Sequence, residues 1–447
     1  MTGAQLRAWS EAAERRMAGF NTQDLANSMY SIGLLGLQLP RSARLAFTAA
    51  VRQRCGAMKP QELANTLLGL AYQFRGRHRD EQPPADVEEA AVELLQAAAR
   101  RLHAMKHQEL ANAAWAFSKL ATWRACEVCD AELCALFGEA AERAAHLPPQ
   151  ELSNLLLAQC NLRFFHPAAL SALAAAAAHQ ARWLDEQHLD NVLLAVAHLP
   201  QHVSEAPEAP QQLRRCVDLA DIAALRQELL RRLTTVERRI AGYTPTCEAI
   251  CRALWALAAL QCCTPEVWHA AMAALGRWHE AGSTDFAEGF AQLYDAQLLL
   301  AADGQHLELP PALHQRVQRA AGLVRQPATV SAWHEKVSAE LRAACVEHRI
   351  EYRPEGAGHS LDIALPDERI AMEVDGPFHF TVNLVHGRHW PLGRTAARNR
   401  LIRMQGWRLV ILDCWTWSRL TGSKERQAWL LQQLAAARQQ SAAGCAD

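Results

Sequence analysis

The sequence has no long apolar run and almost no net charge. No stretch reaches the length and apolarity of a membrane-spanning helix, since the alanine-rich run 174–178 is short and weakly hydrophobic, so we expect no membrane insertion. The formal net charge is −1, so a partner bound through charge must be recognised from a local cluster of charged residues. Aromatic residues make up only 6%, while alanine and leucine are abundant, which favours closely packed helices over a β-rich fold.

The sequence also lacks a regular cysteine framework and a recognisable targeting segment. Its 13 cysteines are an odd number scattered through apolar segments, which is typical of a reducing compartment without disulfides. Cys126, Cys129 and Cys134 begin like a zinc motif, but no second pair follows, so we expect no resident metal or cofactor. The N-terminal segment carries Glu11 and Glu14, unlike an acid-poor transit peptide.

A six-residue motif recurs along the first half of the chain. The five clear copies, each followed by an apolar helical pattern, end at Asn27, Asn65, Asn112, Asn154 and Asn191. Successive asparagines are 38, 47, 42 and 37 residues apart, which is the period of a two-helix repeat. Segments 75–86 and 123–130 lengthen two of the units and are predicted to be loops, and weaker copies occupy 247–258 and 286–301.

Within one copy, Pro60 and Glu62 suit the first turn of a helix, and Leu63, Leu67 and Leu70 line one face. The asparagine lies beside this apolar face. Its first interpretation is structural, as an amide that bonds backbone groups or a neighbouring repeat. The alternative is contact with a base, in which case the base-reading side chains are more plausibly at variable neighbouring positions, such as Thr66, Ala113 or Leu155.

These copies resemble the octotricopeptide repeat family. Segments 60–71, 107–117 and 149–158 fit its motif well, and the resemblance covers residues 15–305 with the later third degenerate. It implies an α-solenoid of helix-turn-helix repeats over 1–305 that binds RNA sequence-specifically in organelle gene expression, with about one repeat per base.

The pattern changes after residue 327. It predicts a helix, three strands, a helix, a strand and a helix, at 330–348, 349–353, 361–365, 369–374, 395–405, 407–412 and 424–437. This order resembles the restriction-endonuclease-like fold, and segments 370–380, 393–395 and 406–408 more closely resemble the RAP domain. We therefore predict a mainly α protein with a linker at 306–327, a small α/β RAP domain at 328–440 and a tail at 441–447.

Three carboxylates in this domain are candidate catalytic residues. Glu373 and Asp375 share one face of a predicted strand and Asp362 lies on the neighbouring strand, so they could converge on Mg²⁺ or Mn²⁺ in a nuclease. However, Asp375 stands where the fold's nucleases place a lysine, which argues against cleavage. The alternative roles are structural, or contact with RNA that is not cut, and a metal is expected only for a nuclease.

The second candidate site is a basic run. Residues 376–412 include no acidic residue, and we predict RNA contact by Arg388, Arg394, Arg398, Arg400, Arg403 and His379. A solvated helix face is the alternative for the arginines, and a packed loop histidine is the alternative for His379.

The sequence thus predicts a non-enzymatic protein that binds single-stranded organellar transcripts and acts on their stability, processing or translation. The family resemblance implies a chloroplast location, with the mitochondrion as the alternative. Two other hypotheses stay open: a metal-dependent RNA endonuclease guided by the repeats, and a solenoid scaffold that docks protein partners.

Overall fold

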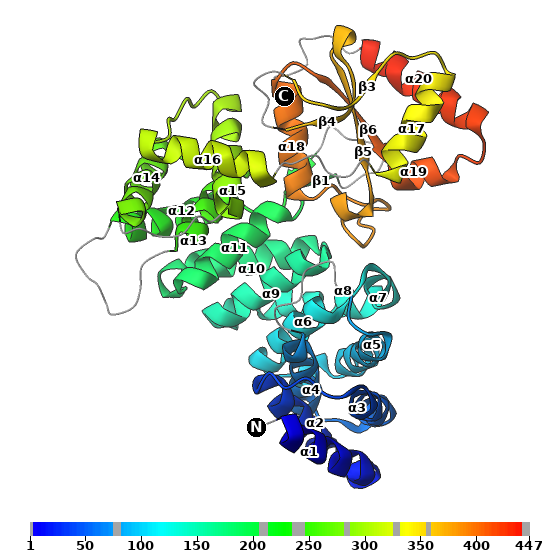
Figure 1. Ribbon diagram of the computed structural model, residues 1–447. Helices are drawn as coiled ribbons and strands as arrows, with labels where there is room; N and C mark the ends of the chain where they lie inside the picture. The colour runs from blue at the N-terminus through cyan, green and yellow to red at the C-terminus, as the bar shows by residue number, and fades with distance from the viewer. Residues whose placement is uncertain are drawn as a thin grey trace. The chain divides into compact units, whose positions relative to one another are not determined.

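A computed structural model describes residues 3–74, 82–204, 213–234, 246–280, 287–324, 331–354 and 359–439. The chain divides into two compact units (Figure 1). The first contains Met1–Leu225 together with Val382–His389, and the second contains Arg226–Thr381 together with Trp390–Asp447. The predicted tail at 441–447 lies outside the described residues.

The first unit is a two-layer array of helices. The layer that we call the close-packed layer consists of α2 (Thr22–Leu34), α4 (Pro60–Gln73), α6 (His107–Leu120), α9 (Pro149–Leu162) and α11 (Glu186–His198). Each of these helices packs directly against the next. The other layer consists of α1 (Gly3–Arg16), α3 (Arg41–Arg54), α5 (Ala85–Ala99), α8 (Asp130–Arg143) and α10 (Pro167–His179). The predicted α-solenoid is confirmed.

Each of the five clear copies of the repeat motif is the start of a close-packed helix. A 3-10 turn precedes each one, at Met17–Gly19, Cys55–Ala57, Leu102–Ala104, Ala144–His146 and Ala181–Trp183. The first turn forms as its sequence suggests: Pro60 begins α4 and the Glu62 carboxylate accepts a hydrogen bond from the Lys59 N–H at 2.9 Å. The predicted apolar face is also confirmed, because Leu63 and Leu67 are completely buried.

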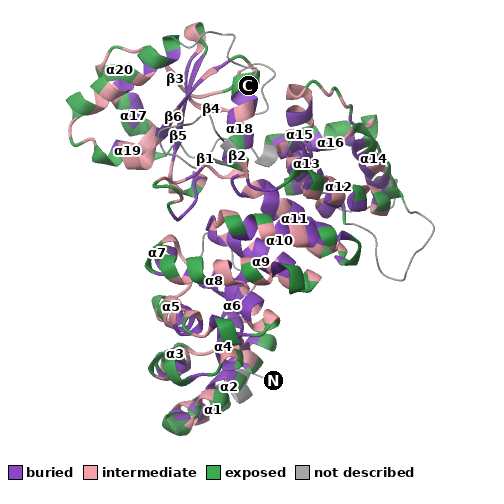
Figure 2. Ribbon diagram, turned by 180° about the vertical axis from the view of Figure 1, so that it is seen from behind, coloured by how far each residue is buried: buried purple, intermediate pink, exposed green. Residues whose placement is uncertain are grey.

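Two glycines set the spacing between α2 and α4. A Cβ added to Gly33 would lie 2.3 Å from the Gly69 carbonyl oxygen, and one added to Gly69 would lie 2.4 Å from the Met29 carbonyl oxygen. The two backbones are therefore in direct contact, and no larger side chain fits between them. Figure 2 shows the resulting burial, with buried residues concentrated on α4 and α6.

One predicted loop of this unit is helical. Trp123–Val128 forms the short helix α7, with Thr122 as its N-cap, because a threonine hydroxyl that accepts the Ala125 N–H starts a helix in the inserted segment. In the other insertion, residues 75–81 lie outside the described residues. The strands β1 (His202–Ser204) and β2 (Leu213–Arg215) form an antiparallel pair after the last clear repeat.

Helix α12 (Leu219–Thr234) spans the boundary between the units, and further helices follow in the second unit. They are α13 (Cys247–Ala259), α14 (Pro265–Glu280), α15 (Ala287–Ala302) and α16 (Pro311–Val324). The weaker copies of the motif correspond to α13 and α15, which pack side by side. Helix α16 lies within the segment predicted as a linker, and it packs against α15.

The C-terminal part has the predicted order of elements around a four-stranded mixed sheet. Its elements are α17 (Ala332–Ala343), β3 (Arg349–Tyr352), β4 (Leu361–Leu365), β5 (Ile370–Asp375), α18 (Gly393–Met404), β6 (Arg408–Asp413), α19 (Cys414–Arg419) and α20 (Ser423–Gln439). The strand order is β3-β4-β5-β6, with β5 and β6 parallel and the other neighbours antiparallel. Helix α19 was not predicted, and it begins where Asp413 caps it through the Thr416 N–H.

Two apolar clusters hold this sheet between helices. One joins Val337 and Leu341 of α17 and Leu430 of α20 to Ile363 and Met372 of the sheet. The other contains Ile402 of α18 and Ala371 of β5, so α18 covers the opposite face. None of the described helices is long and apolar enough to cross a bilayer.

Candidate nucleic-acid interface and acidic site

The five signature asparagines lie at one equivalent position of the close-packed layer, in contact with solvent. Asn27 is exposed and the other four are half-buried. The Asn191 amide donates to the Ser153 hydroxyl at 3.4 Å, whereas the other four side chains form no hydrogen bond with another described residue. The first four repeats therefore present a row of amides whose donor and acceptor groups are free of hydrogen bonds to other described residues.

The variable neighbours do not share this exposure. Thr66, Ala113 and Leu155 are completely buried, and the Thr66 hydroxyl donates to the Glu62 carbonyl oxygen at 2.7 Å. The prediction that these three positions would reach a base is therefore wrong, because a residue next to the asparagine on the helix turns towards the apolar face.

Aromatic side chains lie beside the asparagines in the first three repeats, and the sequence reasoning missed them. The ring centroids of Tyr30 and Tyr72 are 6.4 Å apart, and those of Tyr72 and Trp115 are 5.9 Å apart. The Lys119 ammonium lies 5.6 Å from the Trp115 ring centroid. We call Tyr30, Tyr72 and Trp115 the aromatic row. Each stands three or seven positions after a signature asparagine, and this spacing is the sequence signal that could have revealed them.

The acidic residues of β5 face α18. Glu373 and Asp375 share one face of the strand, as predicted, and both are completely buried. The Arg398 guanidinium of α18 bridges them, with its Nη2 atom 3.0 Å from Glu373 Oε2 and 2.7 Å from Asp375 Oδ1. A cation of the chain itself thus lies between the two carboxylates, so this pair does not fit a catalytic metal.

Burial dominates the electrostatics of this pair. It raises the pKa of Glu373 to about 8, Arg398 acts in the opposite direction, and the charges of Asp362 and Asp375 add to the rise. Burial lowers the pKa of Arg398, but the three carboxylates together outweigh it and the net pKa is raised, so the guanidinium stays charged.

Asp362 and His379 stand on either side of this pair. Asp362 Oδ2 accepts the Val374 N–H at 2.8 Å and its own N–H donates to Glu373 Oε1 at 3.3 Å. His379 Nδ1 lies 3.3 Å from Asp375 Oδ1, and burial lowers the pKa of this imidazole. The three predicted acidic residues and His379 are therefore brought together, with Arg398 among them.

The other predicted arginines are dispersed. The Arg400 guanidinium donates to the Ala258 carbonyl oxygen at 3.0 Å and pairs with Asp303 at 3.4 Å, so it joins α18 to α13 and α15 within the second unit. Arg394 and Arg403 are exposed, while Arg388 is half-buried in the first unit. Of the predicted basic run, Arg394 and Arg403 are thus the members most accessible to a phosphate.

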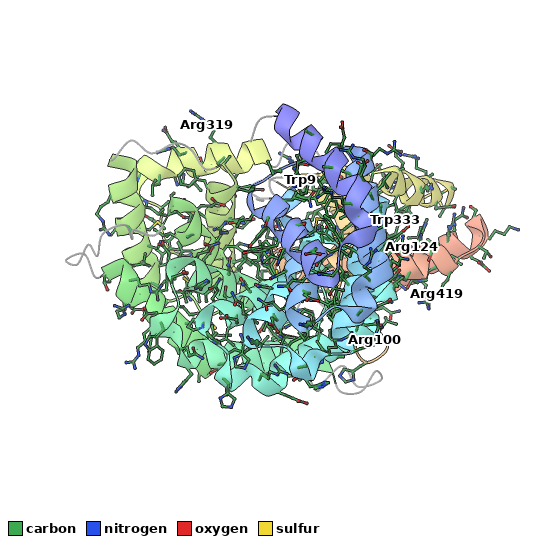
Figure 3. All side chains as sticks on the ribbon, turned by 90° about the horizontal axis from the view of Figure 1, so that it is seen from below. Trp9, Arg100, Arg124, Arg319, Trp333 and Arg419 are labelled. Carbon is green, nitrogen blue, oxygen red and sulfur yellow. The ribbon has the colours of Figure 1, made fainter. Side chains whose placement is uncertain are left out.

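Exposed arginines also occur far from this run in the sequence. Figure 3 labels Arg100 and Arg124, which belong to the first unit, and Arg319 and Arg419, which belong to the second. All four are exposed. Positive charge available to a polyanion is therefore distributed over both units and is not confined to α18.

Comparisons with known proteins agree with this architecture. Residues 8–199 match the family model described as the Tbc2 translation factor, N-terminal domain, and residues 372–433 match the RAP domain. The chain is thus a helical-repeat protein of the octotricopeptide type with a C-terminal RAP domain, and the resemblance predicted from the sequence is confirmed.

One curated relative matches a short part of the chain. A chloroplastic RAP domain-containing protein from Oryza sativa subsp. japonica is 42% identical over 73 residues, which are 16% of this chain. The aligned region is 11% of that relative, so the chain matches only a small part of its length.

Proposed function

We propose that this protein binds single-stranded RNA with the solvent-exposed face of its close-packed helix layer, and so controls chloroplast transcripts after transcription. The observation that carries the proposal is the row of amides with free hydrogen-bonding groups, at equivalent positions of successive repeats. An amide offers both a donor and an acceptor to a base edge, and unstacked bases present such edges.

The aromatic row supports the same ligand. Aromatic faces and edges beside a polar row are typical of surfaces that stack the bases of a single strand, and Lys119 adds a positive charge there. The exposed residues Arg394 and Arg403 supply phosphate contacts in this proposal, whereas Arg398 and Arg400 hold the RAP domain in place.

The comparisons support the setting. The relative from Oryza sativa is described as chloroplastic, which supports an organellar location, and the chloroplast is our proposal. The N-terminal match is described as a translation factor domain, so among stability, processing and translation we favour control of translation.

The test is a crosslinking and sequencing experiment on RNA from the organelle, followed by binding of the enriched sequence to purified protein. We expect N65A/N112A and Y72L/W115L to weaken binding at least tenfold each, since base stacking is worth about 1–3 kcal/mol per base. Q96A is the matched control, because Gln96 is a half-buried amide on α5 in the other layer. Equal affinity of all these proteins, or no enriched RNA, would contradict the proposal.

Two alternatives have direct tests. The endonuclease hypothesis requires RNA cleavage in Mg²⁺ or Mn²⁺ that D362A abolishes, and the Arg398 bridge argues against it.

The protein-scaffold hypothesis is supported by Leu34 and Leu35, which are 58% and 68% exposed at the end of α2. Affinity capture with and without ribonuclease separates it, because a scaffold keeps its partners after RNA is removed.

A further inference from the structure

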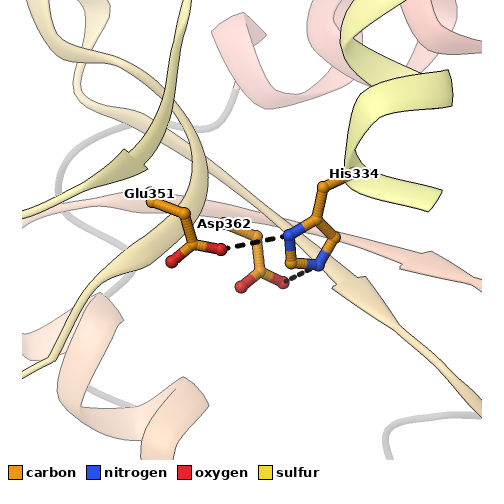
Figure 4. Close-up of side chains that lie close together, drawn as sticks. All are labelled: His334, Glu351 and Asp362. Carbon is orange, nitrogen blue, oxygen red and sulfur yellow. Dashed lines mark hydrogen bonds and ion pairs between the residues drawn. The ribbon is translucent and has the colours of Figure 1, made fainter. Parts of the chain in front are cut away.

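A second polar cluster lies between α17 and the first two strands of the sheet. His334 comes from the first turn of α17, Glu351 from β3 and Asp362 from β4 (Figure 4). His334 Nδ1 is 3.1 Å from Glu351 Oε1, and His334 Nε2 is 3.7 Å from Asp362 Oδ2. One nitrogen or oxygen atom of each residue lies within 4.8 Å of those of the other two, and no other such group of three occurs among the described residues.

Hydrogen bonds hold the start of α17 and the two carboxylates in place. The Ser331 hydroxyl accepts the His334 N–H at 3.1 Å, which starts α17 at a defined position. Glu351 Oε2 accepts the Ser360 hydroxyl at 3.2 Å, and Asp362 Oδ2 accepts the Val374 N–H at 2.8 Å. Because three separate elements hold these groups, the cluster does not depend on a long, freely rotating side chain.

Burial makes the cluster different from a set of surface carboxylates. The side chains of His334, Glu351 and Asp362 are 14%, 18% and 15% exposed. Two carboxylates and one imidazole meet in a place with little water, where a divalent cation balances the charge of the carboxylates.

We propose that His334, Glu351 and Asp362 bind a divalent metal ion. Two carboxylate oxygens and one imidazole nitrogen suit a cation such as Mn²⁺, which accepts oxygen ligands and tolerates imidazole. Ligand bonds of about 2.1 Å bring such atoms to roughly 3 Å from one another, so the side chains need to close by only about an ångström. The imidazole now bridges the two carboxylates, and it must turn to direct one nitrogen to the ion.

This site differs from the acidic pair of β5. There, Arg398 already supplies the positive charge between Glu373 and Asp375. Asp362 connects the two places, because its N–H donates to Glu373 Oε1 while its carboxylate faces His334. The metal ion would join α17 to β3 and β4, and the proposal involves no reaction and does not depend on RNA binding.

The test is titration of the full-length, chelator-treated protein with Mn²⁺ alone, with free Mn²⁺ followed by electron paramagnetic resonance. Manganese is chosen because the many thiols of this chain compete for zinc. We expect one site, weakened at least tenfold in H334A and in E351Q. E351Q keeps the size and hydrogen-bonding capacity of Glu351, so it answers the question even if H334A does not fold.

H188A is the matched control. His188 Nδ1 lies 3.1 Å from Asp185 Oδ1, which is a histidine–carboxylate pair without a second carboxylate. Unchanged binding in H188A together with loss in E351Q supports the proposal. It is overturned if the unmodified protein binds no Mn²⁺ at millimolar concentration, if E351Q binds as the unmodified protein does, or if H188A weakens binding equally.

Discussion

Arg398 determines how the acidic pair of β5 is used. Because its guanidinium bridges Glu373 and Asp375, the pair forms a buried ionic contact and does not fit a catalytic metal ion. Its side chain retains 26% exposure, yet its guanidinium contacts two carboxyl groups whose side chains have none. Removing the cation leaves the buried Asp375 carboxylate without its counterion, beside the Glu373 carboxyl group, which costs more than the ion pair itself contributes. In this protein Arg398 is therefore first a structural residue, whatever else approaches α18.

We predict that R398A destabilises the RAP domain by about 3 kcal/mol, since breaking a buried ion pair leaves its partners uncompensated. Thermal unfolding of the full chain measures the effect, with R394A as the control because Arg394 is exposed on the same helix. Adding E373Q and D375N to R398M should restore most of the stability. If R398A and R394A melt at the same temperature, the bridge does not hold the domain.

The raised pKa of Glu373 has a pH signature. With a pKa of about 8 in the folded state, Glu373 holds its proton between about pH 5 and pH 8, whereas the unfolded chain has lost it. Its contribution to stability is therefore fully present below the unfolded pKa and is lost as the pH rises through 8, by about 1.4 kcal/mol per pH unit at most.

E373Q removes this titration. The melting temperature of E373Q relative to the unmodified protein should accordingly rise from pH 5.5 to pH 8.5. The comparison cancels the titration of every other group that the substitution leaves alone. A difference in melting temperature that does not change with pH would show that Glu373 stays ionised in the folded protein.

At the scale of elements, the contact between α2 and α4 depends on two glycines. Neither Gly33 nor Gly69 accommodates a methyl group, because backbone atoms of the other helix occupy that space. A glycine normally weakens a helix, so its presence in both helices indicates that close approach outweighs helix propensity here. The aromatic row lies beside this contact, with Tyr30 on α2 and Tyr72 on α4.

We predict that G33A and G69A each destabilise the first unit by about 1–3 kcal/mol, because the two helices must separate. G138A is the matched control, since a Cβ at Gly138 in α8 meets nothing within 4 Å. That substitution should stabilise the protein by up to about 1 kcal/mol through helix propensity alone. Equal effects of the three substitutions on the melting temperature would refute the close approach.

Element boundaries were predictable wherever the sequence has a local signal. The motif gave the start of all five close-packed helices, and the alternation of apolar residues gave β4 to the residue. Helices α7, α16 and α19 were missed, because their starts depend on a capping side chain or on packing against a distant helix.

The candidate sites were less predictable, for a physical reason. The run of positive charge on α18 is visible in the sequence, but the sequence does not distinguish the roles of Arg394, Arg398 and Arg400. Which of them turns inward depends on β5 and on α13 and α15, which are remote in sequence. His334 and Glu351 were missed for the same reason, since they meet Asp362 only after the sheet forms.

At the scale of the whole molecule, one pairing within the first unit joins segments that are 218 residues apart in sequence. Asn383 Oδ1 accepts the Phe165 N–H at 2.8 Å, and Asn383 Nδ2 donates to the Phe165 carbonyl oxygen at 2.9 Å. The Val382 N–H donates to the Arg163 carbonyl oxygen at 2.9 Å. Arg163 is the left-handed residue that ends α9, so its carbonyl is turned out of the helix.

We predict that N383A increases the hydrogen exchange rate of the Phe165 amide at least tenfold, because the buried N–H loses its acceptor and each lost bond of this kind costs about 1–3 kcal/mol. Mass spectrometry of peptides covering 163–165 measures it. L384A is the control, since Leu384 is 59% exposed and the hydrogen bonds to Phe165 are formed by the neighbouring Asn383. Protection of Phe165 that survives N383A would mean that this pairing is dispensable.

The Asn383–Phe165 pairing also has a consequence for the order of events during synthesis. The helices of the array contact their immediate neighbours and can assemble while the ribosome is still translating. Phe165, in contrast, has to wait for a partner made 218 residues later. A chain whose translation stops early keeps two unpaired backbone groups in the middle of an otherwise finished array. These two groups gain their hydrogen-bond partners only once the segment that contains Asn383 has been made.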